Sequence, residues 1–201
     1  MLLVIDYGSG NLRSVSKACE LLGANVVVSS EYKDIERADK IILPGVGAFR
    51  DAVEALNRFQ LIAPLKAALL DAKKPYLGIC LGMQLLFAES EEAKGVNGFN
   101  IFEGSVKRFK SSDLKVPHMG WNTINRCSDS PLFKNLKDEA FFYFCHSYYC
   151  APDKEAVISS KTDYVTDFTS SIWSDNIFGV QFHPEKSQKL GLTVLKNFIE
   201  L

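Results

Sequence analysis

The sequence predicts an α/β protein with a mostly parallel central sheet, doubly wound so that helices cover both of its faces. Two observations in the first half of the chain predict this class. Short, continuous apolar runs alternate with segments whose apolar residues recur at helical spacing. Turn-forming residues separate the two kinds of segment. Strands that are apolar throughout are typical of parallel sheets, because helices pack on both faces of such a sheet.

The elements of this half follow in order. Strands are expected over residues 2–5, 26–28, 40–43 and 76–79. Helical spacing predicts helices over residues 12–22 and 49–56, another that runs to about residue 72, and one over 81–88. Gly23 is expected to end the first helix, because glycine readily adopts the left-handed conformation found after helix C-termini.

The pattern changes from about residue 96 onward. Short aromatic and β-branched segments there predict antiparallel or mixed strands over residues 105–109, 121–124, 140–149, 156–160, 171–173 and 178–182. A last helix is expected over residues 187–200, with Leu190, Val194 and Phe198 on one stripe. The chain has no internal repeat, low-complexity tract or linker, so residues 1–201 are expected to form one domain.

The composition argues against several classes of function. Lys and Arg number 23 and Asp and Glu 24, a net charge of -1, so no overall field attracts nucleic acid or an anionic membrane. No uncharged stretch is as long as a membrane span, and the N-terminus lacks the basic region of a signal peptide. The five cysteines form an odd set without a C-x-x-C pair, which favours the cytoplasm.

Neither a metal nor a cofactor is expected. Alternation along a strand places Cys145 and His146 on opposite faces, which argues against a shared metal. The Gly8 to Asn11 turn begins like a dinucleotide fingerprint, but Arg13 occupies the place of the third glycine. The charged clusters at residues 33–40 and 89–94 are interpreted as solvated faces.

Cys80 is the candidate nucleophile. It lies in Gly78-Ile79-Cys80-Leu81-Gly82, the cysteine form of the strand–turn–helix elbow that lifts a nucleophile above a sheet. A thiol at a helix N-terminus is favoured as thiolate by the helix dipole. The backbone N–H of Leu81 is the expected first donor of an oxyanion hole, and the glycines of Pro44-Gly45-Val46-Gly47 could supply a second. The alternative is a small residue packed at a strand end.

The candidate base is His183, with Glu185 as its orienting group. Pro184 biases His183 toward extended geometry at a strand end, and ligands gather at the carboxyl ends of such strands. A thiolate needs a base and a third group that holds the imidazole. His118 and His146 remain rival bases, because spacing alone cannot exclude them.

Together, the segments Gly78 to Gln84 and Gly179 to Ser187 resemble the class I, or triad, glutamine amidotransferases, whose fold is flavodoxin-like. The resemblance implies a Cys80–His183–Glu185 triad that hydrolyses glutamine. It also implies oxyanion donors at Leu81, Val46 and Gly47, and a glutamine site. The implied glutamine-binding residues are Gly45, Gly47, Gln84 and the backbone at Ser147 and Tyr148.

The resemblance to one branch of the class covers essentially the whole chain. Val46 narrows the match to this branch, because other members usually carry a third glycine at that position. Residues 6–11, 117–122 and 146–149 also resemble this branch, the glutaminase subunits of imidazole glycerol phosphate synthases. The resemblance implies that ammonia passes to a (β/α)₈-barrel cyclase subunit in a heterodimer, for histidine biosynthesis. It implies a partner interface at Asn11, Trp121, Tyr143 and Lys186, and an oxyanion strand that stays misaligned until the partner holds its ligand.

Three other interpretations remain. The first is a glutaminase subunit of another class I amidotransferase, such as pyridoxal phosphate synthase. The second is a stand-alone cysteine hydrolase or chaperone-like protein, against which the His183-Pro184-Glu185 segment argues. The third is a catalytically silent interaction subunit, which normally lacks one of the three triad residues.

Overall fold

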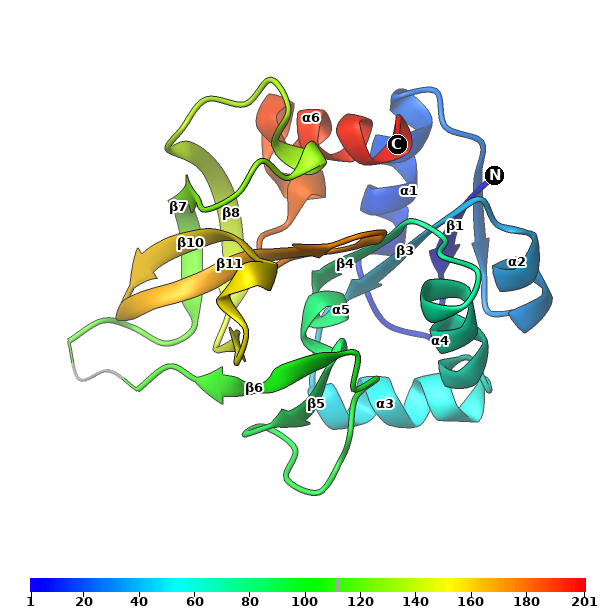
Figure 1. Ribbon diagram of the computed structural model, residues 1–201, viewed down its shortest axis with the longest axis horizontal. Coiled ribbons are helices and arrows are strands. Elements are labelled where there is room, and N and C mark those ends of the chain that lie inside the picture. Colours follow the sequence, from blue (N-terminus) through cyan, green and yellow to red (C-terminus); the bar gives the residue numbers. More distant parts are fainter. Residues whose placement is uncertain (111–112) are drawn as a thin grey trace.

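The computed structural model describes residues 1–110 and 113–201, and its first half alternates strands and helices as expected (Figure 1). The strands are β1 (Leu2–Ile5), β2 (Val26–Ser29), β3 (Lys40–Gly45) and β4 (Tyr76–Cys80). The helices are α1 (Leu12–Leu21), α2 (Tyr32–Arg37), α3 (Phe49–Arg58) and α4 (Ile62–Leu70). Gly23 follows α1 with a φ of 85°, as its role at the end of a helix requires.

The sheet brings together strand ends that are far apart in the sequence. Its parallel part runs in the order β2-β1-β3-β4-β12, where β12 (Ile177–Val180) comes from near the C-terminus. Gly45 at the end of β3 lies opposite Cys80 at the end of β4, and Val180 lies opposite Ile79. Parallel strands end at a common edge, so the loops after these three strands meet there.

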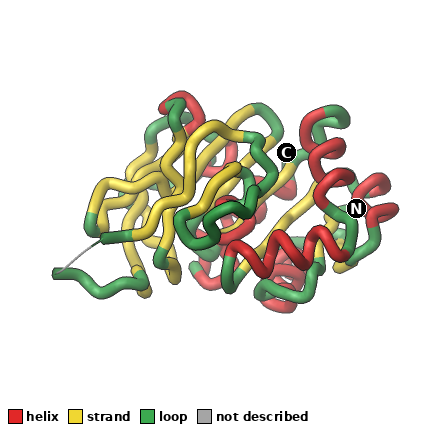
Figure 2. The backbone as a smooth tube through the Cα atoms, turned by 90° about the horizontal axis from the view of Figure 1, so that it is seen from below, coloured by secondary structure: helices red, strands yellow, loops and turns green. Residues whose placement is uncertain are grey.

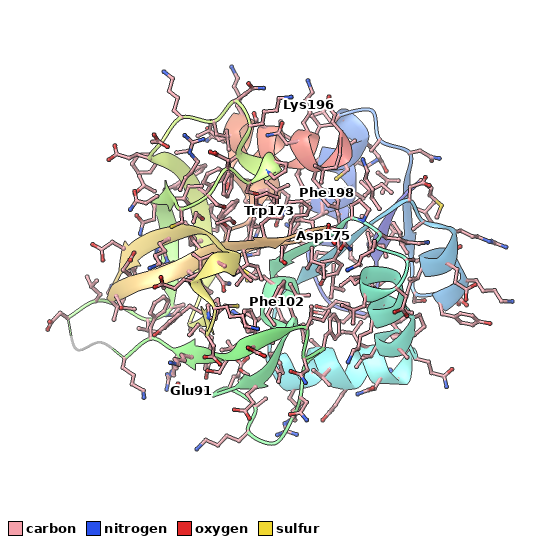
Figure 3. The ribbon with its side chains drawn as sticks, viewed as in Figure 1. Glu91, Phe102, Trp173, Asp175, Lys196 and Phe198 are labelled. Carbon is pink, nitrogen blue, oxygen red and sulfur yellow. The ribbon has the colours of Figure 1, made fainter. Side chains whose placement is uncertain are left out.

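Alternate residues of β1 enter two different hydrophobic cores. Leu3 and Ile5 pack with α2, α3 and α4, whereas Leu2 and Val4 pack with α1 and with α6 (Gln188–Ile199). Phe198 of α6 belongs to the second core and lies edge-on to Phe178 of β12, against which Trp173 stacks (Figure 3). Helices therefore cover both faces of the parallel strands, and the predicted fold class is confirmed.

The second half extends the sheet with antiparallel strands, which gather at the end away from most of the helices (Figure 2). From β12 the sheet continues in the order β11-β10-β7-β8, each strand antiparallel to its neighbour. A small layer of β5, β6 and β9 attaches through β9 to β11. These strands are β5 (Phe87–Ser90), β6 (Phe102–Arg108), β7 (His118–Arg126), β8 (Ala140–His146), β9 (Tyr148–Pro152), β10 (Ile158–Tyr164) and β11 (Thr166–Ser174).

Two local expectations were wrong, and helix α2 was not predicted. The helix expected over residues 81–88 is only α5 (Leu81–Gln84), because the carbonyls of Leu85 and Leu86 accept bonds from residues 99 and 101 instead of continuing the helix. The segment over residues 140–149 divides at Ser147 into β8 and β9. Helix α2 was not expected, because its residues were interpreted only as a solvated charged face.

Within residues 1–110 and 113–201, no helix combines the length and the apolar content needed to cross a membrane.

Candidate active site

Cys80 occupies a strained turn between β4 and α5. Its φ of 54° and ψ of -106° lie in a region that side chains other than glycine rarely adopt. The two flanking glycines make the turn possible: a Cβ on Gly78 would lie 2.4 Å from the Gly82 carbonyl oxygen, and a Cβ on Gly82 would lie 1.9 Å from the Leu43 carbonyl oxygen. The sequence pattern therefore packs the elbow directly against the end of β3, with the Cys80 thiol at the common strand edge.

His183 and Glu185 form a buried pair beside this elbow. His183 follows β12, and Glu185 lies in the 3₁₀ turn Pro184–Lys186. The imidazole Nδ1 lies 2.9 Å from Glu185 Oε1, and the two side chains are only 3% and 1% exposed. Asn11 Nδ2 donates to the same Oε1 at 3.3 Å. The carboxylate is thereby fixed from two sides, and it fixes the imidazole in turn.

The pKa of His183 reflects these neighbours. Burial alone would lower the pKa, but the charge and a hydrogen bond of Cys80, together with the hydrogen bond and charge of Glu185, raise it to about 10. The site therefore favours the protonated imidazolium form of His183 at neutral pH. In this form the histidine is ready to give up a proton.

A cavity of about 260 Å³ opens over Cys80 and His183. Nine of the predicted catalytic, oxyanion, glutamine-binding and interface residues line it, namely Val46, Gly47, Cys80, Leu81, Gln84, Ser147, Tyr148, His183 and Lys186. Glu92, Pro117, Cys145 and His146 complete the lining. Gly45 lies behind the cavity wall, where a Cβ would come within 2.8 Å of both the Tyr7 hydroxyl and the Leu81 side chain. Glu185 stands behind His183.

Glu92 is the site residue that the sequence interpretation missed. Its Oε2 accepts a hydrogen bond from the backbone N–H of Phe49 at 2.9 Å, which anchors the carboxylate at the cavity. The charged cluster over residues 89–94 was interpreted as a solvated face, and this interpretation was wrong for Glu92. No local sequence signal marks it, because the fold alone brings the start of α3 to the turn after β5.

Val46 and Gly47, which follow the end of β3, also line the cavity. Ser9 Oγ donates to the Val46 carbonyl at 2.7 Å, so this carbonyl points toward the turn after β1. Gly47 has a φ of 95°, which a residue with a side chain could adopt only with strain. Together with the first turn of α5 at Leu81, this segment brings backbone amides to the edge where Cys80 lies.

The rival bases His118 and His146 lie together on the inner side of β7 and β8. Their rings are in contact with each other, with His118 Nδ1 3.1 Å from His146 Nε2. Burial is the main cause that lowers the pKa of His118 to about 4 and that of His146 to about 3. Both rings are therefore neutral at pH 7, and within residues 1–110 and 113–201 neither is bonded to a carboxylate as His183 is.

Three of the four expected interface residues, Trp121, Tyr143 and Lys186, lie close together next to the cavity. Trp121 is 48% exposed, and its ring meets the Tyr143 ring edge-on at 6.2 Å across the β7–β8 pair. Lys186 Nζ lies 5.8 Å from the centre of the Tyr143 ring. Met119 and Phe141 on the same face are 62% and 54% exposed. Asn11 lies apart from these, at the Glu185 carboxylate.

This fold, with a cysteine elbow and a histidine–glutamate pair after the neighbouring strand, is that of a triad amidotransferase. A model of the family "Glutamine amidotransferase class-I" matches residues 3–201, and the chain belongs to this family. Solved structures agree on the fold: a crystal structure of a glutamine amidotransferase has a TM-score of 0.78 at 14% identity, with 99% of each chain covered.

The chain is also similar over its full length to curated relatives. It is 49% identical over 201 residues to the imidazole glycerol phosphate synthase subunit HisH of Chlorobaculum tepidum, with all of both chains covered. It is 48% identical over 204 residues to the subunit of the same name from Methanocaldococcus jannaschii, again with all of both chains covered.

Proposed function

We propose that the chain is the glutaminase subunit of an imidazole glycerol phosphate synthase, and that residues 1–201 act as one glutaminase domain in the cytoplasm. The observation that carries the proposal is the cavity in which Cys80 at its elbow faces His183, itself held by Glu185 at 2.9 Å. The names of the full-length relatives support the choice of synthase over the pyridoxal phosphate alternative.

The reaction begins with attack of Cys80 Sγ on the side-chain carboxamide carbon of glutamine. The negative charge that develops on the carboxamide oxygen is stabilised by the backbone N–H groups of Leu81 and of the Val46–Gly47 segment. The His183 imidazolium gives its proton to the departing nitrogen, and ammonia leaves a thioester on Cys80. His183 then accepts a proton from water, which attacks the thioester and releases glutamate and the free thiol. Glu185 holds the ring throughout.

Substrate recognition uses acceptors on one side of the cavity and backbone on the other. The Glu92 carboxylate is suited to the α-ammonium of glutamine, because an amino acid presents a cation there and the carboxylate is already anchored at Phe49. Gln84, Ser147 and Tyr148 line the same cavity. Gly45 and Gly47 let the chain after β3 approach the substrate closely.

The ammonia passes to a (β/α)₈-barrel cyclase subunit docked on the adjoining surface. Aromatic rings are typical of the central part of a protein interface. Trp121 and Tyr143 provide them, with Lys186 beside the Tyr143 ring. Asn11 links the turn after β1 to the triad carboxylate. Docking of the partner against that turn would therefore act directly on the Glu185 side of the site.

The proposal is tested by glutamate release from L-glutamine, measured for the wild-type chain together with the cyclase subunit. Cys80→Ala is expected to abolish release, whereas Cys127→Ala, which removes an exposed thiol that does not line the cavity, is expected to leave it unchanged. Release by Cys80→Ala at the wild-type rate would contradict the assignment of the nucleophile. A wild-type protein that never releases glutamate would contradict the proposed function.

A further inference from the structure

The two histidines that the triad does not use belong to a buried hydrogen-bonded chain. Asn122 Nδ2 lies 3.3 Å from His118 Nε2, and His118 Nδ1 lies 3.1 Å from His146 Nε2. His146 Nδ1 lies 2.8 Å from the carbonyl oxygen of Tyr148. His118 and His146 are 3% and 6% exposed, and aromatic rings, including that of Phe109, surround both.

The hydrogen-bonded chain continues from the Tyr148 carbonyl to the Cys80 sulfur. Gln84 Nε2 donates to this same carbonyl oxygen at 3.0 Å and to Gln181 Oε1 at 3.1 Å. Gln181 Nε2 in turn donates to Cys80 Sγ at 3.5 Å. Gln181 is fully buried and Gln84 is 5% exposed at the cavity. Two side chains thus connect the carbonyl to the reacting sulfur.

One backbone carbonyl fixes the protons along the whole chain. The Tyr148 oxygen can only accept, so His146 carries its proton on Nδ1 and accepts at Nε2, and His118 is the Nδ1–H tautomer as well. For the same reason the Gln84 amide turns its nitrogen toward Tyr148. Its second N–H then requires an acceptor, which is Gln181 Oε1, and this leaves the Gln181 nitrogen facing Cys80.

These hydrogen bonds leave the side-chain oxygen of Gln84 as an acceptor for a molecule in the cavity. Both N–H groups of Gln84 are used, so Oε1 is the only polar atom of this side chain left for a ligand. Glu92 contributes a carboxylate to the same cavity. Both side chains therefore offer acceptors to the cavity, which fits a cation or an N–H group of the bound molecule.

We propose that His146 and Gln181 are positioning residues that hold Gln84 with only its Oε1 open to the cavity, so that the site selects a hydrogen-bond donor there. The inference rests on the proposed function and identifies how its substrate is discriminated. His118 supports His146, because its Nδ1–H keeps the His146 ring in the tautomer that the Tyr148 carbonyl requires. Aromatic rings surround the two histidines, and each link of the hydrogen-bonded chain pairs a donor with an acceptor, as a buried polar network requires.

The first test compares His146→Asn with His146→Leu, with the cyclase subunit present. Asparagine keeps an N–H donor near the position of Nδ1, whereas leucine removes it and leaves the Tyr148 carbonyl with Gln84 alone. We expect His146→Leu to raise KM for L-glutamine about tenfold, the factor that one net hydrogen bond represents, with a smaller change in kcat. His146→Asn should restore KM to within about threefold of wild type on the same scale.

Phe109→Leu is the matched control. The centres of the Phe109 and His146 rings lie 5.3 Å apart, but Phe109 takes no part in the hydrogen-bonded chain. It should lower the melting temperature and leave KM unchanged. An unchanged KM in a folded His146→Leu variant, or an equal rise in KM in all three variants, would overturn the proposal.

A second measurement needs neither turnover nor a variant. The ring ¹⁵N chemical shifts of the wild-type protein at pH 7 should show neutral Nδ1–H tautomers for His118 and His146. An Nε2–H tautomer of His146 would break the chain at Tyr148 and overturn the proposal. This readout does not depend on glutamine, so it tests the hydrogen-bonded chain separately from the proposed function. Failure of the proposed function would instead appear as a wild-type protein that does not hydrolyse glutamine.

Discussion

His183 Nδ1 lies 2.9 Å from Glu185 Oε1, and a single proline separates the two residues in the chain. The proposed base and its orienting group therefore come from one short turn after β12, whereas the proposed nucleophile comes from the neighbouring strand β4. Because β12 and β4 are parallel neighbours, the register of one strand pair sets the distance between thiol and imidazole. The sheet topology thus brings the three residues of the proposed triad together.

The Glu185→Gln variant should hydrolyse glutamine far more slowly than the wild-type protein. The neutral amide cannot stabilise the imidazolium, and its nitrogen can present a donor to Nδ1 and so favour the wrong tautomer. We expect kcat to fall by about a thousandfold or more, as for the equivalent change in other triads. The measurement is kcat at saturating glutamine, with the melting temperature as a check on folding. A loss smaller than tenfold in a folded variant would show that Glu185 does not orient the base.

Cys80→Gly should be more stable than Cys80→Ala, although both lack the thiol. The backbone at residue 80 has a positive φ that penalises any side chain, and such strain costs about 1–3 kcal/mol. Chemical denaturation should therefore give Cys80→Gly a free energy of unfolding higher than that of Cys80→Ala by about 1 kcal/mol. Equal stabilities would mean that the elbow is relaxed in solution.

Gly82→Ala should destabilise the protein more than Gly23→Ala. Both glycines lie outside regular strands, but a Cβ on Gly82 would lie 1.9 Å from the Leu43 carbonyl, whereas a Cβ on Gly23 meets open space. Gly23→Ala suffers only from its positive φ, a cost of about 1 kcal/mol. Gly82→Ala must also displace β3 from the elbow, so we expect a loss of about 3 kcal/mol or more, at the upper end for overpacking. Similar losses would contradict the close packing of the elbow.

Acid should destabilise the fold through His118 and His146. Their pKa values, about 4 and about 3 in the folded protein, lie below about 6.5, the value expected in the unfolded chain. The unfolded chain therefore binds these protons first, and stability is fully present above pH 6.5 and is lost as the pH falls toward 4. Each histidine contributes up to about 1.4 kcal/mol per pH unit in this window.

The measurement is the free energy of unfolding between pH 7 and pH 5, for wild type and for His118→Gln. Removing one of the two neutral histidines should make the free energy of unfolding fall less between pH 7 and pH 5. Identical slopes for the two proteins would show that His118 is not held neutral.

Much of this molecule could be predicted from the sequence. Apolar runs and glycine-rich turns predict the parallel strands and the Cys80 elbow, and these signals are local. The fold class and the membership in the class I glutamine amidotransferases are confirmed, while the roles of the individual site residues stay predictions.

The remainder depends on contacts between distant segments. Glu92 enters the site only because its carboxylate reaches the start of α3. Helix α5 is short because residues 99 and 101 bond to the carbonyls that would continue it. The hydrogen bond from Asn11 to Glu185 spans most of the chain. No spacing rule predicts such contacts, since each follows from tertiary packing.

The most direct test of the account is the rate of glutamate release from L-glutamine, measured for the purified chain alone and then with the proposed barrel cyclase subunit and its nucleotide ligand. We predict slow release alone and a rise of orders of magnitude in the loaded complex, all of it lost in Cys80→Ala. Release that is absent in both states, or that persists without Cys80, would contradict the central claim that this chain is a triad glutaminase serving a partner.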